Sequence, residues 1–296
     1  MTPRFSILIP TYERVGLLPA LLDAWAAVEA PNGGHEIILA DDGSAAPAIG
    51  VVESYSSKIG LRFLRLPHAG VSATRQAALE ACQGEFVLIT DDDCRPMPGL
   101  LRAYEYAVER FPGYALGGPV INLLTKNIYS ETTQTITTYV TNAWNSGKDG
   151  AVFFTGSNLL LPRKSLEKIG GFDRKWTSRT GEDRDLCRRW AEAGLRMAFV
   201  PNAVMGHAHA LSFRSFFRQH FHYGQGRVQN ELRRKKESST APAWSGPRFY
   251  AGLLMEPMRL FSPLKGAQVC FLTICAQVAT ACGSLQVLFS QKNAGF

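Results

Sequence analysis

The chain has 296 residues, of which 46% are apolar and 19% are charged. This composition excludes a disordered or low-complexity chain, and the length suits one large domain or one domain with an appendage. The net charge of +7 is concentrated in residues 207–236, which contain seven basic residues and a single acidic one, Glu231. Residues 1–206 are near neutral. We therefore expect no nucleic-acid partner, which would favour basic charge over the whole surface, and we expect an anionic partner for the late basic segment.

The first 120 residues alternate short apolar runs with segments of helical periodicity. The apolar runs predict buried strands, and the spacing of apolar residues between them predicts helices. The predicted strands cover residues 5–9, 36–40, 61–66 and 85–90, and the predicted helices cover 15–30, 46–57, 71–82 and 98–111. This alternation indicates an α/β fold with a mostly parallel, doubly wound, Rossmann-like sheet, which binds ligands at the carboxyl ends of its strands.

The middle of the chain is mixed in pattern, and no internal repeat is apparent. Strands are predicted near Gly117–Gly118 and over residues 156–162 and 197–201, and helices over 129–144, within 163–172 and over 181–194. Residues 212–236 are predicted to form a basic, aromatic-rich helix, and residues 237–247 a linker.

A run of 26 uncharged residues separates Lys265 from Lys292. This run is long enough to span a bilayer, but one helical face is less apolar because polar residues recur there: Cys270, Thr273, Gln277, Thr280 and Ser284. Three interpretations stay open: a tilted or interfacial membrane helix, a true span that packs its polar face on another helix, and a buried core helix. The basic segment upstream favours membrane contact, since polybasic stretches bind anionic lipid headgroups.

Three consecutive aspartates, Asp91, Asp92 and Asp93, follow the strand predicted over 85–90. Adjacent carboxylates repel one another unless a cation lies among them. Their oxygens are hard ligands that favour Mg²⁺ or Mn²⁺, and these ions in turn bind phosphate oxygens. The motif therefore predicts a metal and phosphate site, and the alternative is an exposed acidic turn before the next helix.

Two further motifs lie at the same predicted edge of the sheet. Asp41 and Asp42 follow the strand over 36–40, where a carboxylate would accept hydrogen bonds from a ribose or a base, although a simple DDG turn fits equally well. Arg75 lies about one turn into the helix over 71–82, so it would approach a diphosphate at the helix N-terminus. A surface arginine is the alternative interpretation.

Two acidic residues and two histidines stand out later in the chain. Glu182 and Asp183 occupy the start of the helix over 181–194, where they are either dipole-stabilised acids or include a general base. His207 and His209 follow the last predicted strand, and imidazoles ligate borderline metals such as manganese, although a structural role is the alternative.

The six cysteines form no CxxC pair. A chain of this length does not depend on a disulfide framework, so we expect free thiols in a reducing compartment and no zinc site. The N-terminal run Phe5–Pro10 is too short for the apolar region of a signal peptide, so the bulk of the chain is expected in the cytosol.

Taken in order, six segments resemble the family 2 glycosyltransferases of the GT-A fold. They are IPTYER (9–14), ADDGS (40–44), GVSATRQAAL (70–79), ITDDDC (89–94), FTGSNLLLPRKSLEKIGGFD (154–173) and GEDRDLCRRW (181–190). Each segment alone is weak evidence for the family, but the order and spacing of all six are specific. The resemblance covers about residues 4–210.

The resemblance implies roles for the matching residues. Asp183 would be the catalytic base, and Asp93 with His207 or His209 would ligate manganese or magnesium. Several residues are implied to bind the nucleotide diphosphate-sugar donor. For the nucleotide they are Pro10, Thr11 and Glu13 in the pocket, Asp41 or Asp42 at the base, Arg75 near the base or diphosphate, and Asp91 and Asp92 in the acidic motif, with Asp92 near the ribose. Gly156, Ser157 and Asn158 would lie near the sugar, Glu182 belongs to the Glu-Asp pair, and Arg218 or Arg227 would contact the diphosphate.

The resemblance thus implies an inverting, metal-dependent glycosyltransferase with a lipid-linked or glycan acceptor, as in polysaccharide biosynthesis. Residues 1–210 would form the catalytic domain, and residues 211–296 a helical extension on an anionic membrane surface at the cytoplasmic face. One alternative is a sugar nucleotidyltransferase, although PTYER lacks the glycine-rich loop expected of that class. The other is a non-catalytic nucleotide-sugar binding protein.

Overall fold

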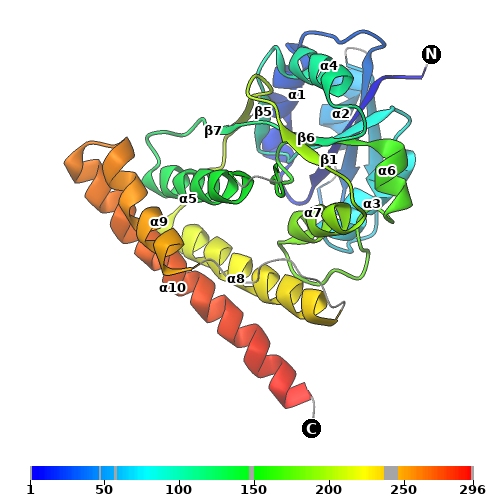
Figure 1. Cartoon of the computed structure of the whole chain (residues 1–296). Helices are drawn as coiled ribbons and strands as arrows, with labels where there is room; N and C mark the ends of the chain where they lie inside the picture. Colours follow the sequence, from blue (N-terminus) through cyan, green and yellow to red (C-terminus); the bar gives the residue numbers. More distant parts are fainter. Residues whose placement is uncertain (1, 47, 57–58, 147–149, 237–245, 295–296) are drawn as a thin grey trace.

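A seven-stranded sheet forms the centre of the fold (Figure 1). The computed structural model describes residues 2–294 except 47, 57–58, 147–149 and 237–245. The strands lie in the order β3 (Leu61–Arg65), β2 (His35–Asp41), β1 (Phe5–Thr11), β4 (Phe86–Ile89), β8 (Leu159–Pro162), β6 (Ala115–Gly117) and β9 (Met197–Phe199).

The predicted mostly parallel sheet is confirmed, with one strand reversed. Strands β3, β2, β1 and β4 are mutually parallel, and β6 is parallel to β9. Strand β8 runs antiparallel to both β4 and β6. The sequence did not predict this reversal, because a short apolar run indicates burial and not strand direction.

Helices cover both faces of the sheet (Figure 1). Ile7 packs on one face with residues of α1 and α4, and Leu8 packs on the other with residues of α3 and α7, because successive strand residues point to opposite faces. The helices of this part are α1 (Leu18–Ala26), preceded by a 3-10 turn at Val15–Leu17, α2 (Ile49–Ser56), α3 (Val71–Ala81), α4 (Leu100–Arg110), α6 (Arg163–Lys168) and α7 (Glu182–Glu192).

A second, three-stranded sheet was not predicted. Its strands are β5 (Cys94–Pro96), β10 (Met205–His207) and β7 (Val120–Asn122). Each has three residues, which is too short for a recognisable apolar run. The antiparallel pairing of β10 with β5 puts His207 opposite Cys94, so this sheet brings the predicted histidine beside the end of the acidic motif.

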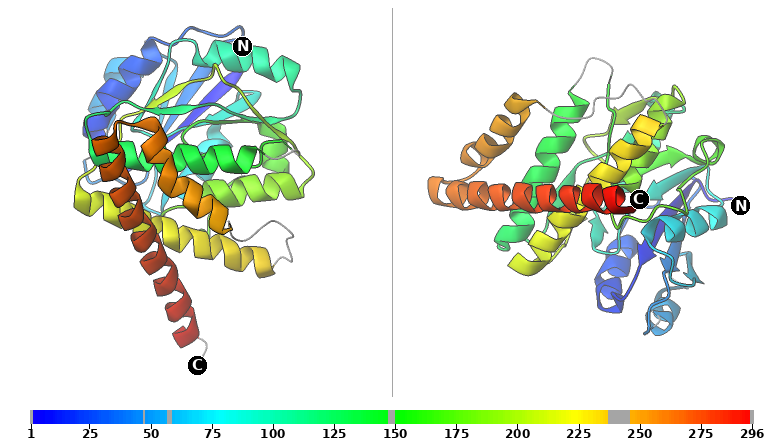
Figure 2. Two further views of the ribbon diagram at one scale, coloured as in Figure 1. Left: turned by 60° about the vertical axis from the view of Figure 1, so that its left-hand side comes forward. Right: turned by 90° about the horizontal axis from the view of Figure 1, so that it is seen from below.

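Four further helices lie together on the lower side of the sheet in Figure 1 (Figures 1 and 2). They are α5 (Ile128–Asn145), α8 (Phe213–Lys236), α9 (Pro247–Leu260) and α10 (Pro263–Ala294). The helices expected over 129–144 and 212–236 are confirmed. Residues 237–245 of the expected linker lie outside the described residues, and Pro247 already begins α9, which was not predicted. The four helices share an apolar cluster made by Ile136, Leu211, Phe216, Leu253, Leu272 and Ala276.

Helices α8 and α10 cross in close contact through small residues. A Cβ on Gly224 would overlap the carbonyl oxygen of Thr280, and a Cβ on Gly283 would overlap that of Phe221. The Ser284 hydroxyl donates a hydrogen bond to the Gly224 carbonyl oxygen at 3.1 Å. The less apolar face of α10 therefore packs on α8.

The opposite face of α10 is apolar and exposed. Its exposed residues recur at helical spacing: Phe271, Ile274, Val278, Leu285, Leu288 and Phe289. Among the described residues, the segment Pro263–Ser290 is the helix whose length and composition would allow it to cross a membrane, and 28% of its most apolar stretch is buried in the fold. The C-terminal part of α10 extends beyond the rest of the molecule (Figure 2).

Candidate functional site

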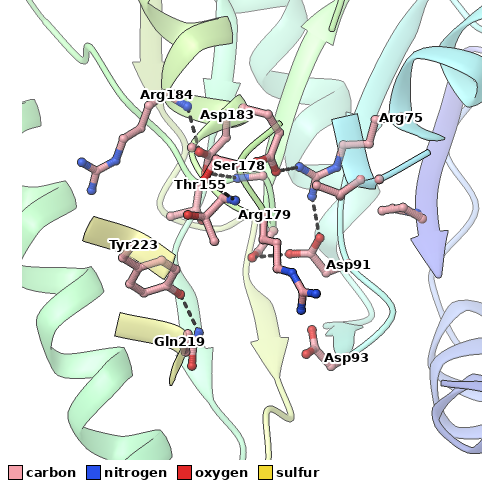
Figure 3. A pocket seen from close by; sticks show the side chains of 18 of the residues that line it. Arg75, Asp91, Asp93, Thr155, Ser178, Arg179, Asp183, Arg184, Gln219 and Tyr223 are labelled. Atoms are coloured by element: carbon pink, nitrogen blue, oxygen red, sulfur yellow. Dashed lines mark hydrogen bonds and ion pairs between the residues drawn. The ribbon is translucent and has the colours of Figure 1, made fainter. Parts of the chain in front are cut away.

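A cavity of about 1030 Å³ lies at the carboxyl ends of β1 and β4. Its walls come from the start of α3, the aspartates after β4, strand β7, the loop before α7, and helices α5, α7 and α8. Figure 3 shows part of this lining. The cavity therefore opens at the edge of the sheet where the sequence motifs were expected to meet.

Arg75 links three predicted site residues. Its guanidinium donates to Asp91 Oδ1 at 2.6 Å and also to Glu182, and Asp91 Oδ2 accepts from the Ser157 hydroxyl at 2.8 Å. Arg75 is 3% exposed, and a Cβ on Gly156 would lie 3.0 Å from its terminal nitrogens. A glycine at position 156 thus allows the loop to approach the buried arginine.

Asp92 and Asp93 share a cation supplied by the chain itself. Arg14 Nη1 lies 2.9 Å from Asp92 Oδ1 and 3.0 Å from Asp93 Oδ2, and the Thr11 hydroxyl donates to Asp92 Oδ2 at 2.8 Å. Burial raises the pKa of Asp92 to about 6; the Arg14 charge opposes this shift and the Asp93 charge adds to it. The two buried carboxylates therefore need a nearby positive charge to remain ionised together.

Both histidines of the HAH motif lie beside Asp93. His207 Nε2 is 3.2 Å from Asp93 Oδ1, and the His209 ring stacks on the His207 ring with centroids 4.8 Å apart. Burial works against protonation of His207, but its hydrogen bond to Asp93 raises its pKa overall. Burial, assisted by the neighbouring His207 charge, lowers the pKa of His209 to about 4.

A group of potential metal ligands is centred on the same pair. Among the described residues, ligand atoms of Asp93, Cys94 and His207 lie within 4.8 Å of one another. Burial raises the pKa of the Cys94 thiol well above its usual value, and a sulfur ligand suits soft metals rather than Mg²⁺ or Mn²⁺. The carboxylate and the imidazole are the suitable donors of the group.

Asp183 and Glu182 differ in their surroundings. Asp183 is half-buried and lines the cavity; its Oδ2 accepts from the Gly156 N–H at 3.1 Å and its Oδ1 from the Arg184 N–H at 2.8 Å. Glu182 is 8% exposed and bound to Arg75. Burial raises the pKa of Glu182 to about 7, against the opposing effect of Arg75. Both acids line the cavity, but Arg75 engages the Glu182 carboxylate, whereas the Asp183 carboxylate (Figure 3) is held by backbone N–H groups.

An aromatic pair also lines the cavity. The Tyr12 and His68 rings stack with centroids 4.3 Å apart, and Tyr12 is 44% exposed. The Asp42 carboxylate accepts from the N–H groups of Ala69 and Gly70 at 2.8 and 3.0 Å and lies 2.9 Å from His68 Nδ1. Asp42 therefore lines the cavity while holding the turn before α3.

Two predicted residues of the nucleotide pocket support nearby turns instead of lining the cavity. Asp41 is fully buried, and its Oδ1 accepts hydrogen bonds from the backbone N–H and hydroxyl of Ser44. Glu13 has a positive φ of 54°, and its side chain accepts from the Ala45 N–H at 2.8 Å. Both join the ends of β1 and β2, and their neighbours Thr11 and Asp42 reach the cavity.

Two other predicted residues also lie elsewhere. Asn158 is 1% exposed; it accepts from the Tyr104 hydroxyl at 2.7 Å and donates to the Ala203 carbonyl oxygen at 2.8 Å. Arg218 is exposed on α8, whereas Arg227, on the opposite side of the same helix, lines the cavity. Arg218 instead borders a separate hollow formed with Phe213, Arg214, Phe217 and Phe221.

Several lining residues were not singled out from the sequence. Tyr12 and Arg14 lie inside the PTYER segment, so their position after a strand was an available signal. The loop over 174–181 gave no such signal, because α8 holds it from a distance in sequence. The Ser178 N–H donates to the side chain of Gln229, and the Thr180 hydroxyl donates to the His222 carbonyl oxygen.

Comparison with known proteins identifies the class to which this fold and cavity belong. Residues 3–226 match the family described as glycosyltransferase like family 2, and the chain belongs to that family.

Two curated relatives illustrate the match. Over 242 residues the chain is 31% identical to the pre-mycofactocin glycosyltransferase of Mycobacterium tuberculosis, with 75% of this chain and 48% of that protein covered. Over 239 residues it is 27% identical to the chondroitin synthase of Escherichia coli, with 68% and 34% covered. The chain thus spans about half the length, or less, of these relatives.

Solved structures agree on the fold. The mannosyltransferase PcManGT from Pyrobaculum calidifontis, in complex with GDP-Man and Mn²⁺, superimposes with a TM-score of 0.66 at 18% identity, covering 98% of this chain and 88% of that one. Residues 1–349 of Staphylococcus aureus TarS, in complex with UDP-GlcNAc, give a TM-score of 0.55 at 15% identity, covering 98% and 92%. The predicted GT-A fold is confirmed.

Proposed function

We propose that this chain catalyses the inverting, metal-dependent transfer of a sugar from a nucleotide diphosphate-sugar to an acceptor hydroxyl. The observation that carries the proposal is the position of Asp183, a half-buried carboxylate that lines the same cavity as the three aspartates and His207. A base and a cation-binding cluster in one cavity are the two parts that a single displacement needs.

The donor would bind between the aromatic pair and the acidic cluster. Tyr12 and His68 offer ring faces for a base, and Pro10, Thr11 and Asp42 line the adjoining wall. Figure 3 shows Arg179 on the side of Asp91 and Asp93, where its cation would face the diphosphate. The complexes of the structural neighbours with GDP-Man and UDP-GlcNAc support a nucleotide-sugar as the donor.

Asp93 and His207 would hold the divalent metal, with His209 beside them. A carboxylate oxygen and an imidazole nitrogen only 3.2 Å apart form a suitable donor set for Mn²⁺ or Mg²⁺. When bound, the ion would neutralise negative charge that builds on the leaving diphosphate. The Mn²⁺ in the complex of PcManGT supports this assignment.

Asp183 accepts the proton of the acceptor hydroxyl as the oxygen attacks the anomeric carbon. The new carbon–oxygen bond forms while the bond to the diphosphate breaks, and its electron pair leaves with the diphosphate. Attack from the opposite face inverts the anomeric configuration. The N–H groups of Gly156 and Arg184, which donate to the Asp183 carboxylate, hold the base in place.

We assign residues 1–210 to the catalytic domain and 211–296 to a helical extension that also completes the cavity. Gln219, Tyr223 and Arg227 on α8 line the cavity, and α8 packs on α10. The extension would therefore connect the active site to a surface on which α10 rests, at the cytoplasmic face of a membrane with a lipid-linked or glycan acceptor.

Of the three interpretations open for α10, we propose the interfacial membrane helix, which is supported by its exposed apolar face and its packing on α8. Helix α8 contacts α10 from the hydrogen bond between Thr280 and the His220 carbonyl oxygen to the hydrogen bond between Gln225 and Gln286. A spanning α10 would take this part of α8, with its histidines, glutamines and Arg218, into hydrocarbon, which is costly. An α10 lying in the headgroup region would bury only its exposed apolar face.

A panel of nucleotide diphosphate-sugars tests the proposal. The wild-type chain is incubated with each sugar nucleotide and Mn²⁺ or Mg²⁺, and thermal stabilisation and release of nucleoside diphosphate are measured. We expect one donor class to stabilise the protein and to be turned over only with metal. Stabilisation without turnover, whatever acceptor is supplied, would favour a binding protein, and pyrophosphate release from a nucleoside triphosphate would favour a nucleotidyltransferase.

A further inference from the structure

We propose that the acceptor carries an anionic group, a phosphate ester or a carboxylate, and that Arg184 binds this group next to the hydroxyl that reacts at Asp183. The inference rests on the proposed glycosyl transfer and adds the chemical class of the acceptor. A lipid phosphate and an acidic sugar share this chemistry, and the test below separates them.

Arg184 is a half-buried cation held by two aromatic rings. Its Cζ lies 4.8 Å from the centroid of Trp144 and 5.5 Å from that of Phe153, and the two rings meet edge-on with centroids 5.4 Å apart. Within the described part of the chain, its guanidinium makes no hydrogen bond or salt bridge. The aromatic contacts fix its place and leave its N–H donors to a ligand in the cavity.

A second guanidinium reinforces the demand for an anion. Arg227 lines the same cavity and donates to the Tyr250 hydroxyl at 3.2 Å. Burial lowers the pKa of Arg184, the Asp183 charge opposes this effect, and the nearby Arg227 charge adds to it. Two like charges in a poorly solvated space repel, and a phosphate or carboxylate between them would relieve that repulsion through charge-assisted hydrogen bonds.

The position of Arg184 assigns the anion to the acceptor and not to the donor. In Figure 3 the Asp183 carboxylate lies between the Arg184 guanidinium on one side and Arg75 and Asp91 on the other, with Asp93 farther still. The donor diphosphate belongs with Asp93, at the metal site. Arg184 itself packs on Trp144 of α5, and helices α5 and α8 contribute Ile136, Thr137, Val140, Gln219, Tyr223 and Arg227 to the cavity wall.

Matched anionic and neutral probes test the inference. The wild-type chain is saturated with Mg²⁺ and the nucleoside diphosphate that stabilises it most, and is then titrated calorimetrically with farnesyl phosphate against farnesol, and with methyl glucuronide against methyl glucoside. One anion is expected to bind about tenfold tighter than its neutral partner, since a hydrogen bond to a charged group has that magnitude. The phosphate arm identifies a lipid phosphate, and the carboxylate arm an acidic sugar.

Variants locate the binding group. Arg184→Gln is expected to abolish the preference for the anion while the affinity for the nucleoside diphosphate stays within about twofold, and Arg184→Lys to retain part of the preference. Arg110→Gln is the matched control, because Arg110 also stacks on an aromatic ring, Phe111 at 5.6 Å, but is exposed on α4 away from the cavity. This control should bind every probe as the wild type does.

The outcomes separate the inference from the proposed function. A wild-type chain with equal affinity for each anion and its neutral partner would overturn the inference, and this comparison needs no variant to fold. Equal losses of anion and nucleoside diphosphate affinity in Arg184→Gln would assign Arg184 to the donor. A chain that binds no nucleoside diphosphate with metal would contradict the proposed function itself.

Discussion

Two adjacent acids at the start of α7 show how surroundings assign different roles to similar residues. Glu182 is buried against Arg75, and one of its oxygens, Oε2, has no hydrogen-bond partner within the described residues. Asp183 faces the cavity and is held by two backbone N–H groups. The sequence alone placed both acids at a helix start, but only the fold shows that Arg75 forms its salt bridge with Glu182.

Replacing Asp183 by Asn tests its role as the base. The amide keeps the shape of the side chain but does not accept a proton, so kcat should fall by about 10²- to 10⁴-fold. Binding of the nucleoside diphosphate, measured by calorimetry, should change little. Glu192→Gln, at the exposed end of the same helix, is the control and should keep wild-type turnover; a similar kcat in Asp183→Asn would remove Asp183 from the chemistry.

The sequence predicted the acidic motif, but it predicted only some of the residues that contact this motif. The place of the three aspartates after a strand predicted a metal and phosphate site, and the family resemblance implied that Asp92 lies near the ribose and Asp93 ligates the metal. Arg14 joins them across about eighty residues, and no periodicity reports such a contact. Asn158, in contrast, matched a family segment but supports the backbone through hydrogen bonds to Tyr104 and Ala203.

At the scale of elements, prediction succeeded where apolar runs were long enough. The strands β1 to β4 and helices α5 and α8 were expected from periodicity. Helix α9 was missed because its first residues follow a segment rich in Ser, Gly and Pro, which indicates a loop. The direction of β8 depends on which neighbours it meets, and this is a property of the fold as a whole.

The contact of α8 with α10 is predicted to depend on Gly224. A Cβ at this position would overlap the Thr280 carbonyl oxygen, so Gly224→Ala should force the helices apart and cost about 1–3 kcal/mol of unfolding free energy. Gly50→Ala on α2 is the control, because a Cβ there meets nothing within 4 Å. Urea denaturation measures both, and equal stability of the two variants would contradict the close crossing.

The packing of α8 on α5 predicts a pH effect. His220 is 2% exposed, and its Nε2 lies 3.2 Å from the Thr133 hydroxyl. Burial, with a smaller effect of the His209 charge, lowers the pKa of His220 to about 3. Because the folded-state pKa is depressed, its contribution to stability is complete above the unfolded pKa near 6.5 and is lost as the pH falls below it.

Comparison with His220→Gln isolates this effect. The difference in unfolding free energy between wild type and variant should shrink by about 1.4 kcal/mol for each pH unit from 6.5 downwards, provided the fold persists. Denaturant titrations at pH 7.5, 6.5 and 5.5 measure it. Parallel stability curves for the two proteins would show that His220 does not titrate in this way.

At the scale of the whole molecule, the basic side chains of residues 207–236 lie in several different places. Arg227 lines the cavity, and Arg233 forms a salt bridge to Asp173 at 2.5 Å over the Trp176 ring. Arg214 and Arg218 are exposed beside aromatic residues. The net charge seen in the sequence predicted an anionic partner, but it did not reveal that part of this charge supports the loop that lines the cavity.

Membrane contact is predicted to depend on the exposed face of α10. Deleting the extension would strip Leu253, Leu272 and Ala276 from the shared apolar cluster, so a surface substitution is the sharper test. Phe271 is 64% exposed, and Phe271→Glu should reduce recovery with sedimented vesicles of equal phosphatidylcholine and phosphatidylglycerol several-fold. Ile49→Glu, at a residue 54% exposed on α2, is the control; equal vesicle binding by both variants would contradict the interfacial helix.

The anomeric configuration of the released sugar tests the proposed inverting, metal-dependent displacement most directly. The wild-type chain is incubated with an α-configured nucleotide diphosphate-sugar and Mg²⁺, and the released sugar is followed by proton NMR. We predict that the β-anomer is released first, before mutarotation, and that EDTA stops the release. Release of the α-anomer, or release that continues undiminished in EDTA, would contradict a single metal-dependent displacement at this site.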